Sequence, residues 1–187
     1  MKNIKAYIKI NFSFSPSEME KILECFTLKT FKKKDYFLKE GQYCKSVGFV
    51  EKGNFIYYQN INGEEKICDF AFENDWVTHY KSLLGNMPSE INIKALENSE
   101  LYLLNIHKME TLSQTLPKVN LIRSTVAEQY FTKSTQRASN LTNLDAKGRY
   151  QALLEEIPFI HQRVPQYYIA SFLGIKPQSL SRIRAEK

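Results

Sequence analysis

The chain has 187 residues, of which 43% are hydrophobic and 13% aromatic, so it can bury the core of one large domain or two small ones. It contains no apolar run of about 18 residues, which excludes a transmembrane helix. Its first residues lack the pattern of a secretory signal. We therefore expect a cytoplasmic protein with no membrane partner.

Neither a metal site nor an enzyme active site is expected. Cys25, Cys44 and Cys68 are widely spaced and form no Cys/His motif, so we interpret them as free thiols. The isolated histidines are interpreted as structural. No Ser/His/Asp set, carboxylate pair or P-loop is present, so the protein is predicted not to be an enzyme.

Positive charge is concentrated toward the carboxyl end. The net charge is +6, and residues 130–187 hold nine of the 26 Lys and Arg residues but only four of the 20 Asp and Glu residues. This asymmetry favours a polyanionic partner for the last third of the chain. A solvated basic face would have the same composition, so the charge alone does not decide between them.

The stretch SFSPSEMEKILECF predicts a first helix that ends near Phe26. Ser15 and Glu18 form a capping box, and Pro16 suits a first helical turn. Apolar residues then follow at helical spacing.

A β-rich region follows this helix. Short runs of Phe, Tyr, Ile and Val alternate with glycines, which is typical of an antiparallel sandwich or barrel. Asn62-Gly63 is a strong hairpin signal, because a type I′ turn needs positive φ at both central residues. Residues 91–106 predict two more strands.

A long helix is predicted from Pro117 onward, where about 20 residues without Gly or Pro would form a rod of about 30 Å. Val119, Ile122 and Val126 make an apolar stripe with Tyr130 close to it. This stripe can pack on the β domain or pair with a second copy of the helix. The pattern leaves both possibilities open.

The last residues predict two short helices that cross steeply. Ala170 supplies the small residue at the crossing, and Gly174 supplies the turn, where a left-handed backbone is needed. Leu180 and Ile183 face the shared core. The outward side chains are types that contact bases and phosphates, and the candidate DNA-binding residues are Lys176, Gln178, Ser179, Ser181, Arg182 and Arg184.

These stretches resemble the Crp–Fnr family of transcription regulators over essentially the whole chain. FLKEGQYCKSVGFVEKGNFIYY is similar to the start of the family's β-roll, and RYQALLEEIPFIHQRVPQYYIASFLGIKPQSLSRIR is similar to its DNA-binding half. The resemblance implies a homodimer through the long helix, with Val119, Ile122, Val126 and Tyr130 as the dimer-helix residues. It also implies a palindromic double-stranded DNA operator and makes RNA polymerase a candidate partner.

The expected fold class is α+β. Residues 1–114 form a cyclic-nucleotide-binding-like antiparallel β-roll of the jelly-roll or double-stranded β-helix type. Residues 115–140 form the long connecting and dimerisation helix. Residues 141–187 form a helix-turn-helix domain without a full wing.

The nucleotide-binding members of the family carry a Gly-Glu pair for the ribose and an Arg followed by Ser or Thr for the cyclic phosphate. This chain has Thr78-His79 and Ser89-Glu90 at the corresponding places, so cAMP is not expected as the effector. No cofactor is assigned. An unidentified small molecule could occupy a pocket, unless aromatic side chains fill the roll. The candidate pocket residues are Tyr58, Trp76, Thr78, His79, Ser89 and Glu90.

We thus predict a dimeric, sequence-specific DNA-binding transcription regulator whose β-roll is a sensor that does not bind cAMP. The alternative is a small-molecule sensor or interaction protein that uses the cyclic-nucleotide-binding-like fold without reading DNA.

Overall fold

A computed structural model describes residues 1–185 and divides the chain into two compact units. The roll unit comprises Met1–Tyr57 and Phe70–Ala127. The head unit comprises Tyr58–Asp69 and Glu128–Lys187. The predicted domains, 1–114, 115–140 and 141–187, are continuous segments of the chain. The two compact units are not, because the hairpin segment Tyr58–Asp69 belongs to the head unit.

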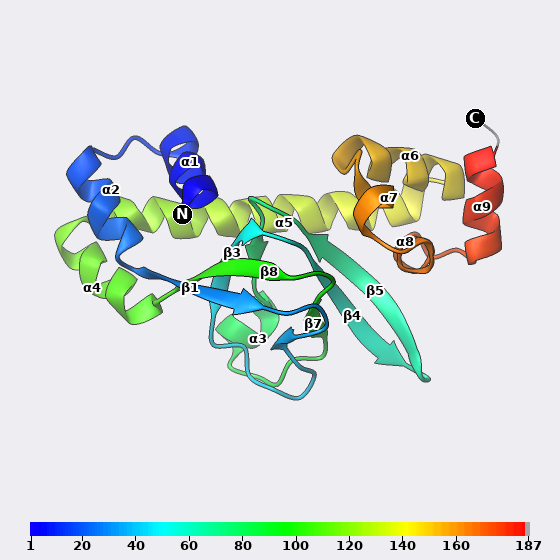
Figure 1. The fold of residues 1–187 in the computed structure, drawn as a ribbon, viewed down its shortest axis with the longest axis horizontal. Coiled ribbons are helices and arrows are strands. Elements are labelled where there is room, and N and C mark those ends of the chain that lie inside the picture. The colour runs from blue at the N-terminus through cyan, green and yellow to red at the C-terminus, as the bar shows by residue number, and fades with distance from the viewer. Residues whose placement is uncertain (186–187) are drawn as a thin grey trace. The chain divides into compact units, whose positions relative to one another are not determined.

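The strands form two four-stranded antiparallel sheets, which confirms the predicted β-roll (Figure 1). The first sheet has the order β1-β8-β3-β6, with bounds Phe26–Phe31, Ser99–Leu104, Val47–Lys52 and Trp76–Val77. The second has the order β2-β7-β4-β5, with bounds Tyr36–Leu38, Asn92–Ala95, Phe55–Ile61 and Glu64–Ala71.

Two turns depend on backbone conformations that the sequence indicates. Asn62 and Gly63 have φ of 52° and 81°, which confirms the predicted hairpin turn between β4 and β5. Gly53 has φ of 94°, and a Cβ built there would lie 2.1 Å from Oγ of Ser99. Only glycine therefore fits between β3 and β4 at this point.

The amino-terminal helices cover part of the roll unit. α1 (Lys2–Asn11) buries Ile4 and Ile8, and was not predicted from the mixed charged and apolar residues of this segment. α2 (Pro16–Leu23) has the predicted capping box, with the Glu18 amide donating to Oγ of Ser15 at 3.3 Å. The helix ends at Leu23 and not as late as the predicted end near Phe26, because β1 begins at Phe26 and pairs with β8.

Glu51 anchors the start of α1. Its carboxylate accepts hydrogen bonds from the amides of Asn3 at 3.1 Å and Ile4 at 3.2 Å, and it also pairs with the Met1 ammonium at 3.0 Å. Burial would raise the pKa of Glu51, but these hydrogen bonds outweigh burial and hold the pKa below its usual value. The negative charge also suits the positive end of the helix dipole.

We expect Glu51→Gln to lower the free energy of unfolding by about 1–2 kcal/mol at pH 7, because the helix loses a charged acceptor. The native pKa is lowered, so the stabilisation is complete above the unfolded pKa of about 4.3 and disappears as the pH falls through the native value. Denaturant unfolding of both proteins between pH 7 and pH 3 measures this. A difference in stability that stays constant with pH would contradict the assignment.

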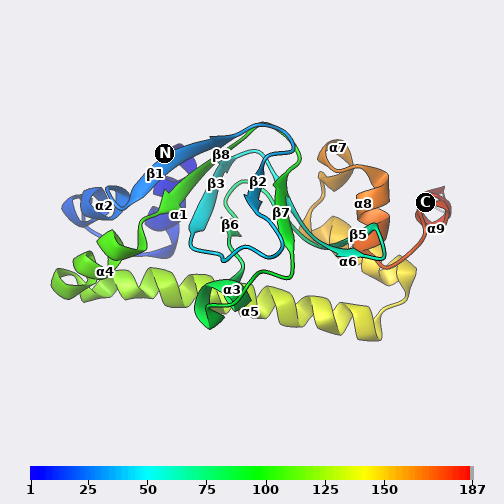
Figure 2. The same ribbon diagram turned by 90° about the horizontal axis from the view of Figure 1, so that it is seen from below.

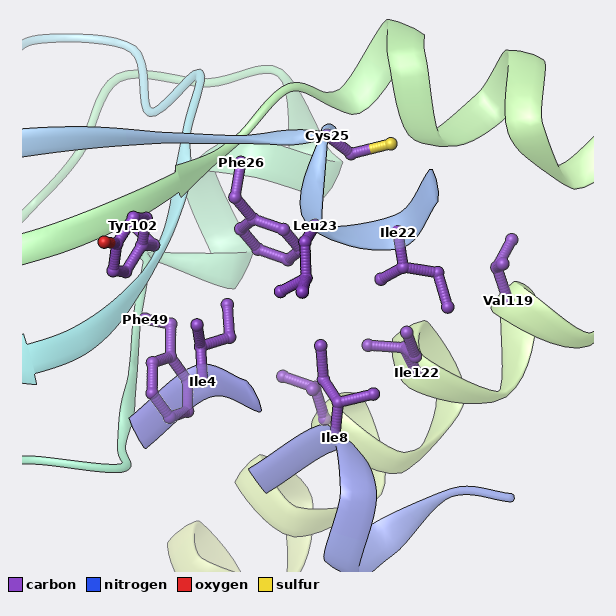
Figure 3. Close-up of a cluster of buried hydrophobic side chains, with 11 residues drawn as sticks. Ile4, Ile8, Ile22, Leu23, Cys25, Phe26, Phe49, Tyr102, Val119 and Ile122 are labelled. Atoms are coloured by element: carbon purple, nitrogen blue, oxygen red, sulfur yellow. The ribbon is translucent and has the colours of Figure 1, made fainter. Parts of the chain in front are cut away.

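Two further helices and the start of the long helix belong to the roll unit. α3 (Tyr80–Gly85) lies between β6 and β7, and α4 (Ile106–Thr115) follows β8 and contacts α2. A short 3₁₀ turn, η1 (Pro117–Val119), then leads into the long helix α5 (Asn120–Asn143), close to the predicted start at Pro117. Figure 3 shows Val119 and Ile122 pointing toward Ile8 and Ile22 within one buried cluster.

The head unit contains four short helices after α5 (Figure 2). They are α6 (Ala146–Glu156), α7 (Ile160–Arg163), α8 (Gln166–Phe172) and α9 (Pro177–Ala185). Asp145 caps α6 as expected, since its Oδ1 accepts from the Gly148 amide at 2.7 Å. The predicted lack of a full wing concerns the chain beyond Ala185 and lies outside the described residues.

Candidate DNA-binding head and effector domain

α8 and α9 pack together at the positions that the sequence indicates. Ala170 is fully buried in α8, and Leu180 is fully buried in α9. Gly174 has φ of 68°, and the Ile175 amide donates to the Ala170 carbonyl at 3.0 Å. The left-handed glycine therefore lets the chain leave α8 and enter α9 with the backbone groups of the turn satisfied.

Most of the predicted DNA-binding residues are accessible. Lys176, Gln178, Ser181, Arg182 and Arg184 are exposed, and Ser179 is half-buried with its Oγ 3.4 Å from Nη2 of Arg182. Pro177–Ala185 contains no acidic residue. The described part of the helix therefore presents a cationic surface, which suits a polyanion.

Helical spacing divides these residues into two groups. Gln178 is four residues from Arg182, and both lie opposite Leu180, with Ser181 beside them, three residues after Gln178. Arg184 is four residues after Leu180 and lies on the flank, next to the buried side of the helix. The exposed face of α9 thus carries Gln178, Ser181 and Arg182 together, whereas Arg184 lies apart from them.

Arg149 belongs to the basic excess of the last third but supports the fold of the head. Its Nε donates to the Leu173 carbonyl at 3.0 Å, and its Nη1 donates to the Leu144 carbonyl at 2.7 Å. The first bond connects α6 to the end of α8, and the second connects α6 to the residue just before its cap, Asp145. Charge counting in the sequence has no means of separating this structural arginine from an exposed one.

The tip of the β4–β5 hairpin contacts α8 within the head unit. Tyr168 Oη donates to Glu65 Oε2 at 2.7 Å, and Ser171 Oγ accepts from the Ile67 amide at 3.0 Å. Burial and hydrogen bonds with Tyr167 and Glu65 raise the pKa of Tyr168, so its hydroxyl keeps its proton and acts as the donor. The hairpin strand is thereby attached to the first helix of the helix-turn-helix.

Arg137 forms the charged part of the same contact. Its guanidinium pairs with Asp69 of β5 and lies 3.6 Å from Oε1 of Glu156 on α6. It also lies over the ring of Phe172, 5.3 Å from the centroid. The side chains of Arg137 and Asp69 are only 16% and 21% exposed, so solvent screens this pair weakly. The long helix, the hairpin and α8 therefore meet at one arginine.

Three candidate effector residues have their polar atoms engaged in hydrogen bonds within the protein. His79 Nδ1 lies 2.9 Å from Oγ of Ser89, which also donates to the Ile91 carbonyl at 2.8 Å. Thr78 Oγ1 donates to the Ser46 carbonyl at 3.0 Å. Burial lowers the pKa of His79, which favours the neutral imidazole. These residues hold the loops around α3 in place.

The other candidate effector residues lie elsewhere. Trp76 packs against Phe49, with ring centroids 5.1 Å apart. Glu90 is exposed and pairs with Lys81, which lowers the pKa of Glu90. Tyr58 is buried and is the first residue of the head unit. Of the six residues, Trp76, Thr78, His79, Ser89 and Glu90 belong to the roll unit and Tyr58 to the head unit.

The predicted dimer-helix stripe needs a correction. Val119, Ile122 and Val126 are 1%, 4% and 6% exposed, because they pack into the roll unit's own core (Figure 3). They cannot at the same time meet a partner helix. Tyr130 is 43% exposed. Of the two possibilities that the sequence left open, packing on the β domain accounts for the apolar stripe.

Residues 28–115 match the family model of the cyclic nucleotide-binding domain. The regulator CLP of Xanthomonas campestris, described as c-di-GMP responsive, superposes with a TM-score of 0.70 and 15% identity over 92% of this chain and 91% of that chain. The chain has the Crp–Fnr fold. This confirms the resemblance predicted from the sequence.

Other structures with the Crp–Fnr fold are similarly distant in sequence. FixK2 from Bradyrhizobium japonicum has a TM-score of 0.72 and 15% identity over 86% of this chain and 83% of that chain. A regulator of the Crp/Fnr family from Eubacterium rectale has a TM-score of 0.67 and 16% identity over 95% and 85%. No curated protein gives a significant sequence match. No helix among residues 1–185 is long and apolar enough to cross a membrane.

Proposed function

We propose that the protein is a dimeric, sequence-specific DNA-binding transcription regulator and not an enzyme. The observation that carries this proposal is α9, which buries Leu180 against α8 and turns Gln178, Ser181 and Arg182 outward without an acidic neighbour in the helix. Glutamine and arginine pair with adenine and guanine edges in the major groove, and serine contacts either bases or phosphates. CLP is described as a global regulator of gene expression, and the Eubacterium rectale structure as a transcriptional regulator, which agrees with this function.

Dimerisation through α5 would use the exposed face of this helix, opposite the side chains that pack into the core of the roll unit. Leu121 is 51% exposed and Phe131 is 68% exposed, and helical spacing places both away from Ile122 and Val126. Paired helices would join these apolar side chains with a second copy and set two recognition helices on one face of DNA. Such a two-fold dimer reads a palindrome whose half-sites are about 10 base pairs apart.

The roll would act as the sensor without taking a cyclic nucleotide by the arginine-phosphate mode. Ser89 and Glu90 stand where the phosphate-binding arginine is expected, and Ser89 is already bonded to His79. A cyclic phosphate near Glu90 would meet like charge. Strands β4 and β5 continue from the roll unit into the head unit, where Glu65 and Ile67 contact α8 and Asp69 pairs with Arg137 of α5. A signal from the roll would travel to the head along these strands.

We expect Arg182→Ala to weaken binding to a selected operator by about 1–3 kcal/mol and to relax the sequence preference at one position in each half-site. Fragments selected from random DNA, followed by fluorescence anisotropy at several salt concentrations, measure this. Arg184→Ala is the matched control on the same helix. Its flanking position predicts that it weakens binding to all sequences alike and reduces the salt dependence.

Two results would contradict the proposal. One is that the wild-type protein selects no sequence at low salt. The other is that Arg182→Ala changes the affinity for operator and random DNA by the same factor. The first result would mean that the fold serves a sensor or interaction protein that does not read DNA. The second would mean that Arg182 contacts the DNA backbone rather than a base.

A further inference from the structure

The roll unit contains a pocket of about 290 Å³ between α3, α4 and the beginning of α5. Figure 2 shows α3 and α4 against the same long helix. The pocket differs from the predicted effector site, because Thr78, His79, Ser89 and Glu90 are not among the residues that line it. Only Trp76 belongs to both sets. The volume is near the lower end of small-molecule pockets, which begin at about 300 Å³.

The walls of the pocket are mainly apolar. α3 contributes Leu83 and Leu84, α4 contributes Met109, and α5 contributes Ile122 and Val126. These side chains offer no hydrogen bonds, so they favour an apolar ligand body. On the scale of about 30 Å³ per water molecule, the space holds a ligand on the order of ten heavy atoms.

Besides Trp76 and Tyr80, whose rings carry one polar group each, the polar residues of the pocket are Glu110 on α4 and Asn120 and Arg123 on α5. Asn120 and Arg123 are three residues apart, so their donors lie on one side of the helix. Arg123 pairs with no carboxylate among residues 1–185. Glu110 already has a partner, His107, at 3.6 Å. Arg123 is therefore the cationic donor in the lining of this pocket, and its guanidinium matches a carboxylate or phosphate.

Glu110 restricts the charge that the pocket can accept. The carboxylate of Glu110 would repel a phosphate dianion more strongly than a ligand with a single negative charge. The single positive charge of Arg123 compensates one negative charge of a ligand but not two. We propose that this pocket binds a small amphipathic carboxylate, with its apolar body against α3 and α4 and its carboxylate at Arg123. This site goes beyond the proposed DNA-binding function and does not depend on it.

The experiment uses Trp76, which lines the pocket and is the single tryptophan of the chain, so its fluorescence reports occupancy. Octanoate and octanol are titrated into the full-length protein. We expect saturable binding of octanoate that is at least about ten-fold tighter than that of octanol, since only octanoate forms the charged pair.

Variants separate the charged contact from the apolar one. Arg123→Gln is expected to reduce octanoate affinity to that of octanol, whereas Lys108→Gln, an exposed cation of α4 outside the pocket, leaves it unchanged. Leu84 is 68% exposed, so Leu84→Gln should weaken both ligands without unfolding the protein. Leu28→Gln, at a 47% exposed leucine outside the pocket, is its control.

Equal affinity for octanoate and octanol in the wild-type protein would overturn the carboxylate assignment. Octanoate binding that Arg123→Gln leaves unchanged would overturn it as well. A fluorescence change that never saturates, or that Leu84→Gln and Leu28→Gln reduce equally, would overturn the pocket itself. None of these results depends on DNA binding, so they are distinguishable from a failure of the proposed regulator function.

Discussion

Ile122→Ala is expected to lower the free energy of unfolding by about 2–5 kcal/mol, because it leaves a cavity between the long helix and the core of the roll unit. Ile122 is 4% exposed and lies in one cluster with Ile4, Ile8 and Ile22. Urea unfolding of the wild-type and variant proteins at the same protein concentration measures the change.

Ile10→Ala is the matched control for this substitution. It removes the same atoms from a side chain that is 81% exposed on α1, so the expected change is within about 0.5 kcal/mol. Similar small effects at both positions would mean that α5 does not pack on the roll as described. The apolar stripe of α5 would then again be available to a partner helix.

Arg137→Ala is expected to destabilise the head unit by about 2–4 kcal/mol, because it leaves the carboxylate of Asp69 without its cation in a poorly solvated place. The substitution also removes the contact between the guanidinium and the ring of Phe172. We expect the amides of Tyr58–Asp69 to exchange hydrogen faster in the variant, since the hairpin tip opens more easily. Hydrogen exchange resolved by residue or peptide measures this.

The control for Arg137 is Lys133, which pairs with Glu156 at 3.2 Å while the two side chains are 32% and 39% exposed. Lys133→Ala should cost less than about 1 kcal/mol, because solvent screens this pair. A double-mutant cycle of Arg137→Ala with Asp69→Asn isolates the pair energy. A coupling energy near zero, with unchanged exchange in the hairpin, would show that the arginine does not hold the hairpin.

Local signals in the sequence predicted the elements whose geometry depends on one or two residues. Asn62-Gly63 needed positive φ, Ser15 and Glu18 formed a capping box, and Gly174 allowed the turn before α9. Each of these residues acts through its own backbone or through an amide three residues away. The local sequence is therefore sufficient to indicate the hairpin, the α2 start and the helix-turn-helix.

Predictions that needed distant partners were less successful. The stripe of Val119, Ile122 and Val126 was correctly seen as apolar, yet the same pattern fits a dimer helix and a helix packed on its own domain. α1 was missed because Ile4 and Ile8 become buried only against residues much later in the chain. The end of α2 was misplaced because pairing of Phe26 with β8 competes with the helix.

The candidate sites show the same division. Composition and spacing were enough to indicate a basic terminal helix with Gln178, Ser181 and Arg182 outward and Leu180 inward. They could not assign Arg149 and Arg137 to structural contacts, because the partners of these arginines are carbonyls and carboxylates from other elements. Nor could they reveal the pocket beside Arg123, whose walls come from three helices separated along the chain. Turns and amphipathic faces follow from neighbouring residues, whereas burial, ion pairs and cavities arise only when distant segments pack together.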